Sequence, residues 1–109
     1  MLPTTGIPTL YYPHVIDQAI FDADGPRPQF LVDSAALKVL VAALEPGQTI
    51  PAHPEGLAVY HFLAGAGVMS VNDESFAVTA GTTIITPPGA KRGLRATERI
   101  VFLAAKASA

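Results

Sequence analysis

Residues 47–55 read Gly-Gln-Thr-Ile-Pro-Ala-His-Pro-Glu, and residues 81–92 read Gly-Thr-Thr-Ile-Ile-Thr-Pro-Pro-Gly-Ala-Lys-Arg. Both stretches open with a glycine, continue through β-branched residues and contain prolines, which is typical of short strands between tight turns. The glycines and prolines are best explained by chain reversals and strand edges. These residues therefore indicate the fold and are not expected to take part in catalysis.

The rest of the chain continues this pattern of short apolar runs separated by turn residues. Turn signals stand at Pro46-Gly47, Asn72-Asp73, Ala80-Gly81 and Pro88-Gly89. The apolar runs around them cover residues 29–32, 36–44, 57–63, 67–71, 75–79, 83–86 and 100–103. Regular short strands of this kind predict an all-β sandwich or a small barrel.

The run at residues 36–44 has two interpretations. Asp33 or Ser34 could cap a helix there, and the alanines of the run would tolerate one. The length of the run, its valines and the Pro46-Gly47 stop favour a strand instead. We expect a strand that is buried on both faces.

An N-terminal arm at residues 1–28 precedes the barrel that we expect at residues 29–109. Five of the ten prolines lie in this arm, at positions 3, 8, 13, 26 and 28, and they prevent a long helix or a central strand. We expect one short helical turn near residues 15–21. Because the arm carries apolar side chains such as Tyr11, Ile16 and Phe21, it should pack on its own barrel or on a partner subunit.

Composition narrows the class of protein. A chain of 109 residues that is 50% hydrophobic can bury one core, so we expect a single domain. The absence of cysteine excludes disulfides, thiolate metal sites and a cysteine nucleophile. The N-terminus has no leader pattern and no apolar run reaches the length of a membrane span, so we expect a soluble cytoplasmic protein that does not bind membranes.

The charge pattern argues against nucleic acid as a partner. The formal net charge is −2, and the cations concentrate near the C-terminus, at Lys91, Arg92, Arg95, Arg99 and Lys106. A nucleic-acid-binding domain would carry excess positive charge with interleaved aromatic residues. We expect scattered charges on the solvated faces of strands.

The two quoted stretches resemble the paired motifs of the cupin family. The first cupin motif reads glycine, five residues, His-x-His, three or four residues, Glu, six residues and glycine. The second reads glycine, five residues, Pro-x-Gly, two residues, His, three residues and Asn. Gly47 and His53 keep the spacing of the first motif, and Gly81, Pro87 and Gly89 keep that of the second. The resemblance implies a small antiparallel barrel of the RmlC-like, double-stranded β-helix or jelly-roll type, and a homodimer.

The family's metal ligands are largely replaced in this chain. In cupins, two histidines, the glutamate and the later histidine converge on a divalent metal inside the barrel. The first histidine is His53 here, the second falls on Glu55, the glutamate falls on Ala58 and the later histidine falls on Arg92. The loop between Glu55 and Ala58 is also shorter than the family pattern. The motifs thus retain one ligand of four, with Glu55 as a possible second.

Arginine in a ligand position changes the expected chemistry. Its guanidinium is always charged, so it repels a metal cation, and it suits a carboxylate or phosphate in a bidentate geometry. We therefore expect Arg92 to point inward and to meet an anionic ligand, the side chain of Glu55 or water. The predicted ligand-binding residues are His53, Glu55, Tyr60, Phe62 and Arg92, with the two aromatic residues lining the cavity.

A metal site remains the alternative prediction. His53 and Glu55 could hold a divalent ion such as zinc, nickel, manganese or iron, with His61 as a third ligand. Strand alternation places His61 on the opposite face from Ala58, and only a bulge would turn it inward. No phosphate-binding glycine loop, G-x-S-x-G elbow or H-E-x-x-H motif is present in the sequence. Two classes of function therefore remain open: a cupin that binds a small, anionic molecule without catalysis, and a metal-dependent oxygenase, isomerase or lyase. A third possibility is that side chains fill the cavity and the protein acts only through its surface.

Overall fold

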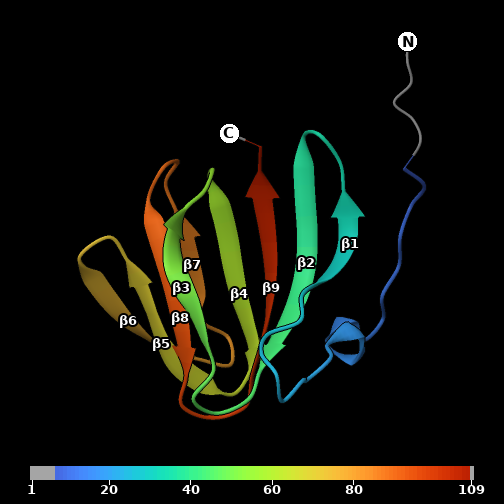
Figure 1. The fold of residues 1–109 in the computed structure, drawn as a ribbon. Coiled ribbons are helices and arrows are strands. Elements are labelled where there is room, and N and C mark those ends of the chain that lie inside the picture. The colour runs from blue at the N-terminus through green and yellow to red at the C-terminus, as the bar shows by residue number, and fades with distance from the viewer. Residues whose placement is uncertain (1–6, 109) are drawn as a thin grey trace.

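The computed structural model describes residues 7–108, which form one short 3-10 turn and nine strands (Figure 1). The elements are η1 (Val15–Gln18), β1 (Gln29–Asp33), β2 (Leu37–Leu44), β3 (Thr49–Pro54), β4 (Ala58–Ala64), β5 (Ala66–Val71), β6 (Glu74–Thr79), β7 (Thr83–Thr86), β8 (Lys91–Ala96) and β9 (Ile100–Ala107). The predicted all-β architecture is confirmed. No helix within the described residues is long and apolar enough to cross a membrane.

The strands form two antiparallel sheets. One sheet has the order β1-β2-β9-β4-β7, and the other has the order β3-β8-β5-β6. The two sheets face each other as the layers of a jelly-roll barrel (Figure 1). The ladder between β2 and β9 is continuous over eight residue pairs, so the alternation of side chains is kept along its whole length.

The core lies between the sheets and is built from alternate residues of the central strands. Strand β2 contributes Leu40, Ala42 and Leu44, and the rings of Phe62 and Phe102 lie 5.8 Å apart at its centre. These side chains are almost completely buried. The core residues of β2, β4 and β9 all have even numbers, so the even-numbered residues of these strands face the barrel interior.

The opposite face of the same sheet carries a second, smaller cluster. Val41, Ala43 and Val101 point outward, and Val15 and Phe21 of the arm pack against them. This explains why residues 40–44 are buried on both faces. The prediction of a strand in this run is confirmed, and the helical interpretation is wrong.

Two strands have no counterpart among the apolar runs of the sequence. Strand β3 contains two prolines and is an edge strand, where a missing N–H is tolerated. Strand β8 reads Lys-Arg-Gly-Leu-Arg-Ala, and four of its six residues are nevertheless buried. These two strands carry the functional positions of the sequence motifs.

Candidate functional site

The two motifs meet in the ladder between β3 and β8. His53 of β3 lies directly opposite Arg92 of β8, and Pro54 lies opposite Lys91. A bulge between Ile50 and His53 interrupts the ladder just before this pair. The register therefore brings together the two motif positions that the cupin resemblance relates.

Arg92 points inward, and its side chain is only 2% exposed. Its guanidinium donates hydrogen bonds to four backbone carbonyls. Nη1 lies 2.9 Å from the oxygen of Gly56, and Nη2 lies 3.0 Å from the oxygens of Glu55 and Ala90 and 3.3 Å from that of Pro87. Nε donates to Ala90 as well, at 3.2 Å. Arg92 thus ties the β3–β4 loop to the β7–β8 loop.

This arrangement corrects the predicted partners of Arg92. The inward direction is as expected, but the contact with Glu55 is made through the backbone carbonyl and not through the carboxylate. Because most of the guanidinium N–H groups are already directed at carbonyls, the fork that would grip an anion is occupied by the protein itself. Arg92 has a structural role in this geometry.

The carboxylate of Glu55 has two other partners. Oε1 accepts a hydrogen bond from Nζ of Lys106 at 2.8 Å, and Oε2 is in contact with Nε2 of His53. Nδ1 of His53 donates to the carbonyl of Pro51 at 2.8 Å. Both ring nitrogens of His53 therefore lie beside oxygen atoms of the protein.

The environment of Glu55 favours its charged form. Partial burial would raise the pKa of this carboxyl, but the hydrogen bonds from Lys106 and His53 outweigh burial and lower the pKa below its ordinary value of 4.5. Lys106, Glu55 and His53 thus form a chain of charge-assisted hydrogen bonds at one end of the barrel. We call these three residues the Lys106 triad.

The sequence analysis did not identify Lys106 as a site residue. It lies on β9, opposite both Lys38 of β2 and Ala58 of β4. Its side chain follows the inward parity of Phe102 and Ala104. The small side chain of Ala58, at the family's glutamate position, leaves room beside it for the lysine. The alternation of β9 was the available signal, but the predicted strand ended at Leu103.

These residues do not fit the metal that the fold family implies. The carboxylate of Glu55 is bound to an ammonium, and the position of the later histidine holds the permanently charged Arg92. Within residues 7–108 there is no group of three or more His, Cys, Asp or Glu side chains that could hold a metal ion. A closed site needs more neutral or anionic donors than this set provides.

His61 is also excluded from such a site. Nδ1 of His61 is hydrogen-bonded to Oγ1 of Thr83 at 2.7 Å, and the two residues are cross-strand partners. Ala58 and Tyr60 face the core from the same strand, so His61 lies on the outer face. The hypothesis that a bulge turns His61 inward as a third ligand is contradicted by this orientation.

The two predicted aromatic residues occupy different environments. Tyr60 lines a cavity of about 40 Å³ together with His53, Arg92 and Lys106, which is room for about one water molecule. Burial raises the pKa of the Tyr60 phenol above 10.0, so this group stays neutral and can donate a hydrogen bond. Phe62 is fully buried in the core, and Phe102 lines the cavity in its place.

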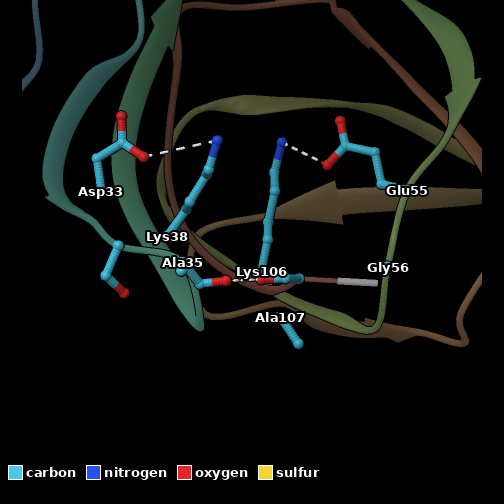
Figure 2. Close-up of a pocket in the computed structure, with 9 residues that line it drawn as sticks. Asp33, Ala35, Lys38, Glu55, Gly56, Lys106 and Ala107 are labelled. Carbon is cyan, nitrogen blue, oxygen red and sulfur yellow. Dashed lines mark hydrogen bonds and ion pairs between the residues drawn. The ribbon is translucent and has the colours of Figure 1, made fainter.

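Two larger hollows adjoin the Lys106 triad. The first, which we call the mouth, has a volume of about 610 Å³ and is lined by Asp33, Ser34, Ala35, Lys38, Glu55, Gly56, Lys106, Ala107 and Ser108 (Figure 2). The second, which we call the groove, has a volume of about 330 Å³ and is lined by Pro26, Pro28, Phe30, Leu40, Ala42, Thr49, Ile50, Pro51, His53, Phe102 and Lys106. Lys106 lines both of these hollows and the small interior cavity.

Comparisons with known proteins agree with this architecture. Residues 40–105 match the family model of the cupin domain. A conserved protein of unknown function from Streptococcus pyogenes has 24% sequence identity over 100% of this chain and 96% of its own, with a TM-score of 0.83. An RmlC-like cupin protein from Desulfovibrio desulfuricans has 20% identity over 91% of this chain and 97% of its own, with a TM-score of 0.80. No curated protein matches the sequence.

One similar structure is that of an enzyme. Salicylate 1,2-dioxygenase from Pseudoaminobacter salicylatoxidans has 18% identity over 78% of this chain and a TM-score of 0.71, but the match covers only 27% of the dioxygenase chain. Similarity at this level of identity shows the shared fold alone.

Proposed function

This chain belongs to the cupin family, and on that premise we propose that it binds a small amphipathic organic molecule at the open end of its barrel. The observation that carries the proposal is the position of Lys106, whose side chain lines the mouth, the groove and the small interior cavity. A ligand in either of the two larger spaces would contact the Lys106 residue. The interior cavity, at about 40 Å³, is too small for the ligand itself.

The groove supplies the apolar part of the proposed site. Its walls include Phe30, Leu40, Ile50 and Phe102, which come from both sheets. Leu40 and Phe102 are buried, whereas Phe30 is 52% exposed. Covering an exposed phenyl ring and the adjoining aliphatic side chains would remove apolar surface from water, which favours a ligand with an apolar body.

The polar end of the ligand would lie at the Lys106 triad. An ammonium group has three N–H donors, and Glu55 accepts one hydrogen bond from Lys106. The neutral phenol of Tyr60 lines the same interior cavity as Lys106. In this proposal Lys106 takes the charge role that the sequence suggested for Arg92, and His53 and Tyr60 remain the hydrogen-bonding groups.

Calorimetric titration with 2-naphthoate tests this function. The wild-type protein should bind this probe, and Phe30→Ala should weaken binding by about fivefold or more, because one wall of the groove is removed. Phe76→Ala is the matched control, since Phe76 is 38% exposed on β6 and does not line the groove. Equal affinities for the wild type and Phe30→Ala would contradict the proposed location.

We also propose that the protein works as a homodimer. The supporting feature is the outer face of the larger sheet, where the cross-strand partners Val59 and Ile85 are 38% and 66% exposed. A second copy would cover such side chains and remove apolar area from water. Light scattering of the gel-filtration peak should give the mass of two chains, and a monomer at dilute concentration would remove this proposal.

A further inference from the structure

We infer that the polar end of the ligand is an oxyanion, a carboxylate or a phosphate, held between Lys38 and Lys106 in the mouth. This inference rests on the proposed function, because it names the charged group of the ligand that the groove would hold. It also adds Lys38, a residue to which neither the cupin motifs nor the comparisons assign a role.

The two lysines are neighbours in the sheet. Lys38 of β2 and Lys106 of β9 are direct cross-strand partners in a ladder without a register shift. Both share the inward parity of Leu40 and Ala104, which belong to the core. Two like charges directly opposite each other on one face destabilise a sheet, so this pair calls for a compensating negative charge.

Each of the two lysines has one carboxylate partner in the protein, on the side that faces away from the other lysine. Figure 2 shows the two lysine side chains extending between Asp33 on one side and Glu55 on the other. Nζ of Lys106 lies 2.8 Å from Oε1 of Glu55. Nζ of Lys38 lies 3.5 Å from Oδ1 of Asp33, which is beyond a good hydrogen bond. The sides on which the two ammonium groups face each other therefore keep donors that no carboxylate of the described residues occupies.

An oxyanion fits this space better than a neutral group. A carboxylate or phosphate has several acceptor oxygens and can take one charge-assisted hydrogen bond from each ammonium. Its negative charge would also relieve the repulsion between the two lysines. The mouth has a volume of about 610 Å³, and Lys106 lines both the mouth and the groove.

The exposure of the two lysines determines how much each should contribute to anion binding. The Lys106 side chain is 22% exposed and that of Lys38 is 53% exposed. Solvent screens an interaction with Lys38 more strongly. Loss of either lysine should weaken anion binding, and the loss of Lys106 should weaken it more.

The first experiment uses inorganic phosphate and acetate as probes, titrated into the isotope-labelled full chain at constant ionic strength and followed by amide chemical shifts. At least one anion should shift the amides around Lys38 and Lys106. In Lys38→Met the dissociation constant should rise by about threefold or more, and in Lys106→Met by about tenfold or more. Lys91→Met, at an exposed position of β8 that does not line the mouth, is the matched control.

Unchanged anion affinity in both Lys38→Met and Lys106→Met would overturn the inference. Thermal unfolding of each variant separates a local effect from loss of the fold. Because Lys38 is largely exposed and faces a like charge, Lys38→Met should not lower the midpoint, and it remains informative if Lys106→Met is unstable.

A second comparison separates this inference from the proposed function. The wild-type protein should bind 2-naphthoate about tenfold more tightly than the uncharged 2-naphthamide, and Lys38→Met should reduce that preference. Equal binding of the two compounds, weakened alike by Phe30→Ala, would overturn the oxyanion inference and leave the groove as the binding site. The protein could instead bind phosphate through both lysines and bind neither naphthalene compound. That result would overturn the proposal that the groove binds a ligand and would leave the anion site between the lysines.

Discussion

Nζ of Lys106 lies 2.8 Å from Oε1 of Glu55. In the family that this chain belongs to, the position of Glu55 carries a metal ligand, so the cation that this carboxylate meets here is a side chain of the same protein. Two features of the sequence allow Lys106 to take the place of a metal cation beside Glu55. Ala58 leaves space at the glutamate position, and β9 is long enough to bring Lys106 opposite it.

The pH dependence of stability should reveal the state of Glu55. Its folded-state pKa is lowered, so its charge stabilises the fold above pH 4.5, the ordinary value, and this contribution is lost as pH falls through the lower folded pKa. Glu55→Gln should therefore be less stable than the wild type at neutral pH. The difference in free energy of unfolding should shrink as the solution becomes acidic.

Urea unfolding at a series of pH values measures this effect. Glu74→Gln, at an exposed position of β6, is the control and should show no such difference at any pH. A gap between wild type and Glu55→Gln that stays constant into acid would show that the carboxylate has no stabilising partner.

Arg92 should contribute to stability through the carbonyls that it binds. Arg92→Met would leave buried carbonyl groups without donors and should cost about 2–4 kcal/mol of unfolding free energy. Arg92→Lys should recover little of this loss, because a single ammonium cannot reach the carbonyls of both loops.

Arg95→Lys is a matched control on the same strand. Arg95 is exposed, and its replacement should change the unfolding free energy by no more than about 0.5 kcal/mol. If Arg92→Lys were as stable as the wild type in urea, this would contradict the prediction that the guanidinium stabilises the fold through its hydrogen bonds.

Gly65 should be much less tolerant of alanine than Gly81. Both glycines have positive φ angles, +86° and +94°. A Cβ atom on Gly65 would lie 1.6 Å from the carbonyl oxygen of Arg99, whereas one on Gly81 would meet nothing within 4 Å.

Gly81→Ala should therefore lower the free energy of unfolding by only about 1–2 kcal/mol, the cost of placing a residue with a Cβ atom at a positive φ angle. Gly65→Ala should cost more than about 3 kcal/mol, because backbone atoms must move apart. Urea midpoints measure both, and equal midpoints would rule out the close approach of the chain at Gly65.

Much of the fold could be predicted from the sequence, because turn glycines and alternating apolar residues depend on local physics. The strand at residues 37–44 follows from such local signals, whereas the inward direction of Arg92 was expected from its place in the cupin motif. Strands β3 and β8 could not be found from apolar runs, since prolines and charges interrupt them.

The partners within the site were harder to predict. Backbone carbonyls accept the hydrogen bonds of Arg92, and every residue carries such a group, so no sequence signal marks them. Lys106 lies three residues beyond the end of the predicted strand, and its pairing with Glu55 depends on a register that only the complete sheet fixes.

Metal content should separate the two classes of function that the sequence left open. Mass spectrometry of protein purified without an affinity tag should find metal near background in both the wild type and His53→Ala, because Lys106 and Arg92 stand where further ligands would be needed. Near-stoichiometric metal in the wild type that is lost in His53→Ala would contradict the binding model and favour a metal-dependent enzyme.

The most direct test of the central claim is calorimetric titration of 2-naphthoate into the wild type and Lys106→Met, with Lys91→Met as the control. The account predicts binding to the wild type and to Lys91→Met, with affinity about tenfold weaker or undetectable in Lys106→Met. Equal affinity in a folded Lys106→Met variant would contradict it, because the ligand would then bind without the residue around which the proposed site is built.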